Sequence, residues 1–166
     1  MYLRALFHGI PGLFFWLFSA CSIQIAPSFD QAIYDKILAS HEQALVLFSG
    51  LSGCPSDCAF STHAARYDAV IASYAVALTR AQARPTPVLG VRLAKSEALE
   101  KVCKTSTPEQ CLNTVPEYLE RARDSLVKLR DRHRSGVLAP GTLDYFIKRY
   151  LLPAQSALAI EGALKR

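Results

Sequence analysis

The chain has 166 residues, of which 51% are hydrophobic and 20% are charged, and its formal net charge at pH 7 is +5. This length is enough for one globular domain with its own hydrophobic core. The basic excess is far below the charge density of nucleic-acid-binding proteins, which excludes nucleic acid as a partner and leaves anionic lipid or glycan as the expected negative partner.

The first 20 residues have the three parts of a secretory signal. Arg4 is the only charged residue before an apolar segment that runs to position 20 and ends in two small residues. Pro11 and Gly12 interrupt this segment, which is shorter than the roughly 20 apolar residues that a membrane-spanning helix needs. A cleaved signal is therefore favoured over a permanent transmembrane helix.

Residues 17–21 read Leu-Phe-Ser-Ala-Cys and resemble the lipobox of bacterial lipoproteins. The resemblance covers only residues 1 to about 22. It implies that the signal peptide, residues 1–20, is removed and that Cys21 carries a diacylglyceryl thioether and an N-linked acyl chain such as palmitate. Ser22 stands where such proteins carry Asp for retention at the inner membrane, which implies the outer membrane and its periplasmic face. An ordinary cleaved signal and an uncleaved anchor are the alternatives.

After processing, residues 21–27 form the lipidated tether and residues 28–166 the folded domain. Six extended residues reach about 20 Å, so we expect the domain to lie close to the lipid surface. Removal of the signal takes away one basic residue, Arg4, and leaves 18 basic against 14 acidic residues, a net charge of +4.

Two long helices are predicted in the first half of the domain. Ser28 and Gln31 fit a capping box, and apolar residues then recur at steps of three and four, which predicts a helix over about residues 29–50. The same period predicts a second helix over about residues 60–83. The Pro85-Thr86-Pro87 segment ends that helix.

The second half predicts two further long helices after a short helical segment. Residues 88–113 favour two short helices joined by a hairpin-like turn, and Thr107-Pro108-Glu109-Gln110 is a capping box for the second. Thr114-Val115-Pro116-Glu117 is a further box, which starts a helix that runs to about Ser135 and ends at Gly136. A last helix follows Thr142, and Pro153 within it removes a hydrogen bond one turn back.

No segment alternates with period two, so the predicted fold class is all-α. Four long amphipathic helices joined by modest loops predict an antiparallel four-helix bundle. The short helical hairpin lies in the crossover between the second and third long helices.

Four cysteines remain after Cys21, an even number in an oxidising compartment, which predicts two disulfides. They are Cys54, Cys58, Cys103 and Cys111. The local pairing, Cys54 with Cys58 and Cys103 with Cys111, is favoured because it needs little loop closure. The crossed pairings are the alternatives. Metal or redox use is disfavoured, because the spacing is not Cys-x-x-Cys and His63 is the only nearby histidine.

The sequence predicts no metal site, no cofactor and no enzymatic activity. His41, His63 and His133 lack the Glu-x-x-His pattern of metal-binding bundles. The chain also has no Gly-x-Ser-x-Gly motif and no phosphate-binding loop. An enzyme of unrecognised mechanism stays open as an alternative.

The distribution of charge is most uneven on the predicted third long helix. Six basic residues there are candidates for contact with an anionic surface: Arg121, Arg123, Lys128, Arg130, Arg132 and Arg134. The alternative is a solvated helix face with internal ion pairs. Four tyrosines on apolar stripes are expected in the core: Tyr67, Tyr74, Tyr145 and Tyr150.

These patterns together predict a lipid-anchored periplasmic bundle that serves as a binding or assembly module for an envelope protein or glycan. Its membrane contact would run through the lipid on Cys21. The alternatives are a bundle whose core encloses a small apolar ligand or cofactor, and the enzyme named above.

Overall fold

The computed structural model describes residues 24–54, 58–104 and 106–165, so the predicted signal peptide, Cys21 and Ser22 lie outside the described residues. Within the described ranges the chain forms seven helices and no strand, which confirms the all-α prediction. None of the described helices has the combination of length and hydropathy needed to cross a bilayer.

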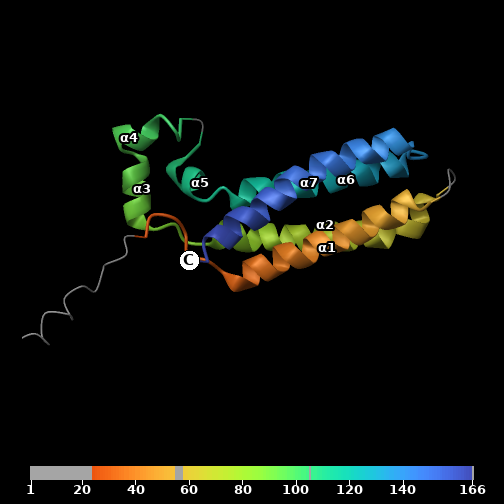
Figure 1. The fold of residues 1–166 in the computed structure, drawn as a ribbon, viewed down its shortest axis with the longest axis horizontal. Coiled ribbons are helices and arrows are strands. Elements are labelled where there is room, and N and C mark those ends of the chain that lie inside the picture. Colours follow the sequence, from red (N-terminus) through yellow and green to blue (C-terminus); the bar gives the residue numbers. More distant parts are fainter. Residues whose placement is uncertain (1–23, 55–57, 105, 166) are drawn as a thin grey trace, which may run out of the picture.

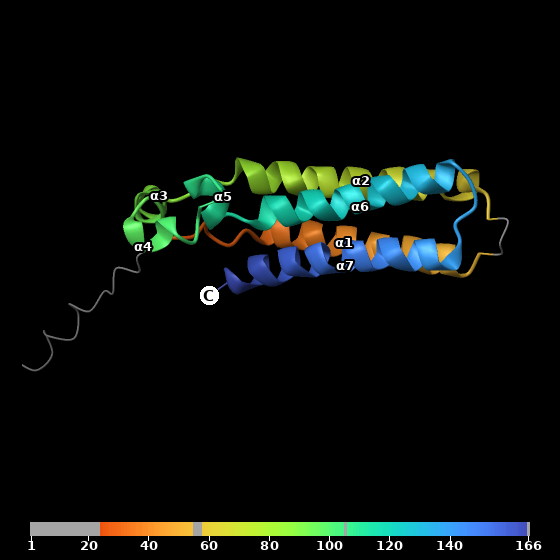
Figure 2. The same cartoon turned by 90° about the horizontal axis from the view of Figure 1, so that it is seen from above.

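Four long helices lie lengthwise beside one another and form a helical bundle (Figures 1 and 2). Helix α1 packs against α2 and α7, and α6 packs against the same two helices. Their bounds are Gln31–Ser52 for α1, Phe60–Ala83 for α2, Val115–Arg134 for α6 and Pro140–Ala163 for α7.

Each long helix turns an apolar stripe toward the centre of the bundle, as the spacing of three and four predicts. The largest fully buried side chains include Tyr67, Tyr74 and Tyr150, each with 0% exposure. The Tyr150 hydroxyl lies 2.6 Å from that of Tyr74 and 2.8 Å from His41 Nδ1. Burial raises the pKa of Tyr74 to about 12 and also raises the pKa of Tyr150, so both hydroxyls keep their protons near neutral pH. The centre is a packed, hydrogen-bonded core.

Two of the three predicted capping boxes are wrong. Asp30 caps α1 in place of Ser28, because its extended backbone lets its carboxylate accept from the N–H groups of Ala32 at 2.8 Å and Ile33 at 3.1 Å. Thr114 has helical φ and ψ, so its side chain makes no cap hydrogen bond to the start of α6. The box at Thr107 is confirmed, with both reciprocal hydrogen bonds present.

Three short helices, not the predicted two, separate α2 from α6. They are α3 (Val88–Ala94), α4 (Glu97–Glu100) and α5 (Pro108–Leu112). Helices α3 and α5 pack together, and the predicted disulfide Cys103–Cys111 links the segment after α4 to α5, with Cα atoms 5.5 Å apart. This short-helix segment lies at the end of the bundle where the described chain begins (Figure 1).

The tether packs on the short-helix segment. A Cβ atom at Gly90 of α3 would come within 2.1 Å of the carbonyl oxygen of Ile25, so only glycine permits this approach. Pro27 is buried. The chain is therefore already fixed to the domain from Ile25 onward.

A buried ion pair joins four helices at this end of the bundle. Arg84 and Glu161 are 8% and 0% exposed, and the Arg84 guanidinium donates to both Glu161 carboxylate oxygens, at 2.7 and 2.8 Å. Arg84 also donates to the Ser28 carbonyl at 3.3 Å and to Asn113 Oδ1 at 3.0 Å. The Asp30 N–H donates to Glu161 Oε1 at 3.2 Å. One charge pair thus holds together the start of α1, the end of α2, the end of α5 and α7.

Candidate functional site

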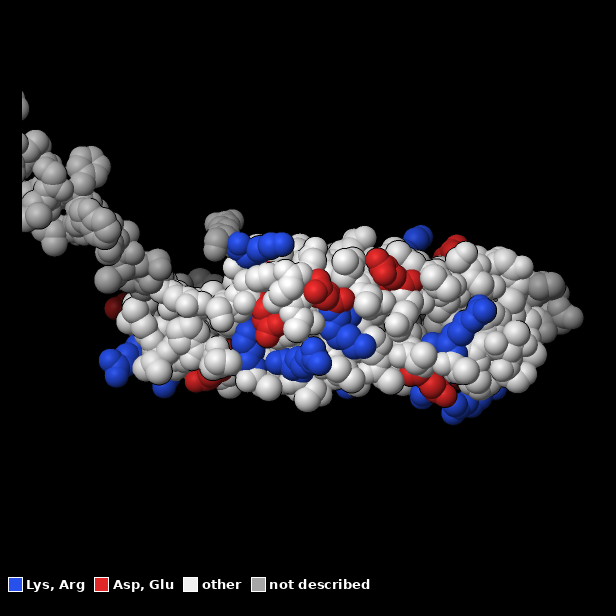
Figure 3. Space-filling view, turned by 90° about the horizontal axis from the view of Figure 1, so that it is seen from below, with Lys and Arg blue, Asp and Glu red and all other residues white. Residues whose placement is uncertain are grey.

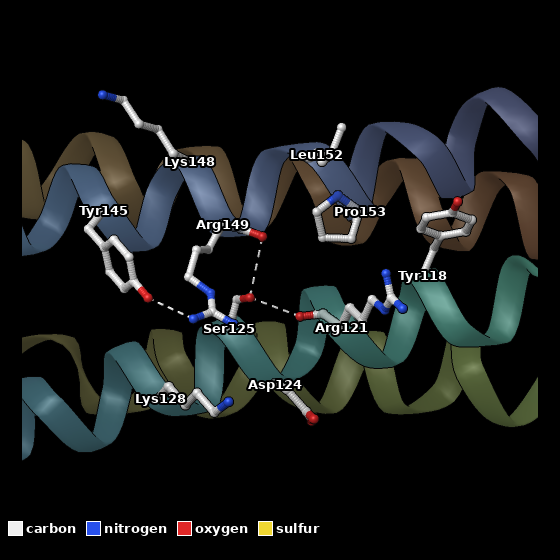
Figure 4. A pocket seen from close by; sticks show the side chains of 10 residues that line it. All are labelled: Tyr118, Arg121, Asp124, Ser125, Lys128, Tyr145, Lys148, Arg149, Leu152 and Pro153. Atoms are coloured by element: carbon white, nitrogen blue, oxygen red, sulfur yellow. Dashed lines mark hydrogen bonds between the residues drawn. The ribbon is translucent and has the colours of Figure 1, made fainter.

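A groove of about 640 Å³ runs between α6 and α7 (Figure 4). Both helices contribute basic and aromatic side chains to it. The lining residues are Tyr118, Arg121, Asp124, Ser125, Lys128, Tyr145, Lys148, Arg149, Leu152 and Pro153.

Four basic residues and one acidic residue line this groove. Arg121 and Lys128 come from α6, and Lys148 and Arg149 come from α7, against the single carboxylate of Asp124. Among the described residues, no carboxylate oxygen lies within 4.0 Å of the charged nitrogens of Lys128, Lys148 or Arg149. The groove therefore has a local positive potential that an anion can neutralise.

The proline inside α7, Pro153, shapes the wall of the groove. Pro153 has no N–H, so the Arg149 carbonyl one turn earlier loses its partner within the helix. Ser125 of α6 lies 3.5 Å from that carbonyl oxygen, and its hydroxyl also lies 2.9 Å from the Arg121 carbonyl oxygen. Figure 4 draws both contacts. Ser125 thus bridges the two helices at the floor of the groove.

Two tyrosines hold the arginines at the groove. The Arg149 guanidinium donates to the Tyr145 hydroxyl at 2.6 Å and lies 5.5 Å from the centre of its ring. The Arg121 guanidinium lies 6.0 Å from the centre of the Tyr118 ring and also pairs with Glu117 on the exposed face of α6. Tyr145 is 51% exposed, so the prediction that it belongs to the core is wrong.

The six basic residues predicted as one surface lie on several faces of α6. Only Arg121 and Lys128 line the groove. Arg123 pairs with Asp124 at 3.0 Å, and Arg130 pairs with Asp131 at 3.0 Å and with Asp68 of α2 at 3.5 Å.

The last two of the six make local contacts near the end of α6. Arg132 donates to the Ser135 hydroxyl at 3.1 Å, and the Arg134 guanidinium lies 5.1 Å from the centre of the Phe60 ring. The alternative of internally paired charges therefore describes part of this set.

Lys148 and Arg149 were not among the predicted contact residues, because they lie on a different helix from the six basic residues of α6. A signal was present: Tyr145, Lys148, Arg149 and Leu152 recur at steps of three and four, which places them on one exposed stripe of the last helix. On the opposite side of the bundle, where α1 and α2 lie, basic and acidic side chains are interspersed (Figure 3).

The second predicted disulfide, Cys54–Cys58, lies at the far end of the bundle, and its Cα atoms are 5.4 Å apart. His63, in the first turns of α2, approaches both sulfurs. The centres of the His63 and His133 rings are 6.0 Å apart. His41 does not join them, because it contacts Tyr150 in the middle of the bundle.

Of the predicted site residues, Arg121 and Lys128 thus lie in the α6–α7 groove, and Cys54 and Cys58 lie beside His63 beyond α1. The remaining predicted residues within the described ranges lie in neither place. No protein-family model, curated protein or solved structure matches the chain.

Proposed function

We propose that the protein is a lipoprotein anchored through Cys21 in the bacterial outer membrane, on its periplasmic face, and that it holds an anionic envelope glycan in the α6–α7 groove. The four long helices act as an antiparallel four-helix bundle that keeps the two walls of the groove in place. The observation that carries this proposal is the groove itself, in which Lys128, Lys148 and Arg149 have no carboxylate partner among the described residues.

The chemistry of the groove favours an acidic sugar chain. Carboxylates or sulfates on sugars can accept charge-assisted hydrogen bonds from Arg149, Lys148 and Lys128. The ring of Tyr145, half-exposed beside them, offers an apolar face for a sugar ring. A flat lipid surface does not enter a concave groove between two helices, so a chain-like ligand fits this shape better than a bilayer.

The position of the tether supports the anchor. Because Ile25 already contacts α3, at most four chain steps separate Cys21 from the domain, a reach of about 14 Å. The end of the bundle at which the tether lies carries exposed apolar side chains, among them Val88 at 69% and Val102 at 75% exposure. Such side chains suit an end that lies against the headgroup region.

The apolar-ligand alternative has less support. The bundle centre is filled by Tyr67, Tyr74 and Tyr150, whose rings are fully buried and hydrogen-bonded or packed edge to face. A small apolar ligand would have to displace these side chains.

The double substitution Lys148→Gln with Arg149→Gln is expected to lower the affinity for oligogalacturonate, an acidic oligosaccharide, by roughly 10- to 100-fold, since two charge-assisted hydrogen bonds are lost. Isothermal titration calorimetry at low and high salt measures this change, and neutral dextran should not bind. Both side chains are exposed, so folding is expected to stay intact.

The matched control is Arg66→Gln with Arg80→Gln, which removes the same charge from exposed positions on α2. It is expected to leave the affinity within about twofold, because distant exposed charges are screened by salt. Absence of binding by the unmodified protein, or an equal loss in both double variants, would contradict the groove as the site.

A further inference from the structure

The cluster at the end of the bundle away from the tether combines two sulfurs and an imidazole. Cys54 follows the C-terminal cap of α1, Cys58 precedes α2, and His63 lies in α2. One ligand atom from each of the three residues can be chosen so that all lie within 4.8 Å of one another. Figure 1 places this end opposite the short-helix segment. None of the three residues lines the α6–α7 groove.

His63 faces the sulfurs with its Nε2 atom, 3.2 Å from Cys54 Sγ and 3.0 Å from Cys58 Sγ. The ring is buried, with 4% exposure, and within the described chain its Nδ1 atom has no hydrogen-bond partner. Sulfur is a weak acceptor, so among the described residues Nε2 has only weak partners. Because Nε2 is the ring nitrogen that faces both sulfurs, it is the atom that a cation held by all three residues would contact.

We propose that Cys54, Cys58 and His63 form a redox-gated metal site, which binds a thiophilic d10 cation of the class of Zn(II) and Cu(I) when the Cys54–Cys58 disulfide is reduced. Two thiolates and one neutral imidazole are the donor set that such cations prefer. The disulfide closes the site, because a sulfur held in an S–S bond is no longer a thiolate.

The opening step needs a dithiol reductant. The dithiol gives two electrons and two protons and becomes a disulfide, while the Cys54–Cys58 bond breaks and leaves two thiols. A divalent cation then replaces the two thiol protons, which pass to solvent. A cavity of about 480 Å³, lined by Cys54, Cys58 and His133 among others, gives both the reductant and the cation access from solvent.

Only a small rearrangement is needed for binding. With metal–sulfur distances of about 2.3 Å and metal–nitrogen distances of about 2.0 Å, tetrahedral geometry puts the two sulfurs roughly 3.8 Å apart and each sulfur roughly 3.5 Å from the nitrogen. The sulfurs are already close to His63 Nε2, so they have to separate mainly from each other. Three protein ligands leave a fourth position open toward the cavity.

His133 acts as a positioning residue for this site. Its Nε2 atom lies 3.1 Å from the Cys58 carbonyl oxygen, and its Nδ1 atom lies 3.2 Å from the Tyr67 hydroxyl. The backbone of Cys58 is thereby held against α6.

Cobalt(II) is the probe that tests the site, because thiolate coordination gives it a charge-transfer absorption band. The full chain carrying Cys21→Ser, Cys103→Ser and Cys111→Ser, so that Cys54 and Cys58 are its only cysteines, is reduced with a phosphine, desalted without oxygen and titrated with Co²⁺. We expect one Co²⁺ per chain with the thiolate band when the protein is reduced, and neither when it is oxidised. Zinc(II) should then displace the cobalt.

Two variants in the same background complete the test. Cys54→Ser with Cys58→Ser should abolish the band, and His63→Ala should weaken binding by at least about 100-fold. If His63→Ala loses helicity in circular dichroism, His63→Gln takes its place. A reduced chain without the band, a band that survives loss of both cysteines, or unchanged affinity without His63 would overturn the Cys₂His site.

Discussion

Replacing Glu161 with alanine is expected to lower the free energy of unfolding by about 3–5 kcal/mol, because it leaves the Arg84 guanidinium buried without its counter-ion. Glu161 is 0% exposed and accepts from Arg84 at 2.7 and 2.8 Å and from the Asp30 N–H at 3.2 Å. The loss is a large part of the 5–15 kcal/mol of a typical domain. Urea denaturation followed by circular dichroism measures it.

A double variant separates the charge pair from simple loss of packing. Arg84→Met with Glu161→Leu removes both charges and keeps apolar volume, so it should be less destabilised than Glu161→Ala alone, since no unpaired charge stays buried. Equal destabilisation of the two variants would show that the charge on Arg84 is not the cause. A loss below about 1 kcal/mol for Glu161→Ala would contradict the buried ion pair altogether.

Substitution Cys21→Ser is expected to release nearly all of the protein from the membrane fraction of a Gram-negative host. The lipid can form only on the cysteine thiol, and the acyl chains provide the anchoring energy, at about 0.8 kcal/mol per buried CH₂ group. Membrane fractionation followed by immunoblotting measures the distribution. The neighbouring substitution Ser22→Ala keeps the thiol and should keep the protein in the membrane.

Either of two results would count against the lipid anchor. Cys21→Ser protein that fractionates as the unmodified protein does would show that another part of the chain holds the membrane. Unmodified protein recovered entirely in the soluble fraction would show that no lipid is attached.

Helix positions were predictable where the apolar repeat and the residues that end a helix indicate the same boundaries. The predicted range 60–83 coincides with α2, because apolar residues recur through the whole segment and Pro85 cannot continue the helix. Cap residues were less predictable, since a capping box depends on one residue's φ and ψ. Thr107 has the required extended backbone and forms its box, whereas Thr114 has helical angles and does not.

Only some residues of each candidate site could be predicted from the sequence, because each site combines elements that lie far apart in the chain. Periodicity shows which face of α6 is apolar, but it does not show that Lys148 and Arg149 of α7 lie beside Lys128. Local cysteine pairing followed from the short separations. The contact of His63 with both sulfurs could be suspected from its place five residues after Cys58, but only the packing of α2 against α1 and α6 puts its ring there.

The central claim is a lipid-anchored domain in an oxidising envelope, and intact mass spectrometry of the protein from a Gram-negative host tests it most directly. Alkylation before reduction is done in the same experiment. The prediction is a mature chain that starts at Cys21, carries added acyl chains and has its four other cysteines protected from alkylation. An unprocessed chain of 166 residues with free, alkylated thiols would contradict the anchor and the compartment together.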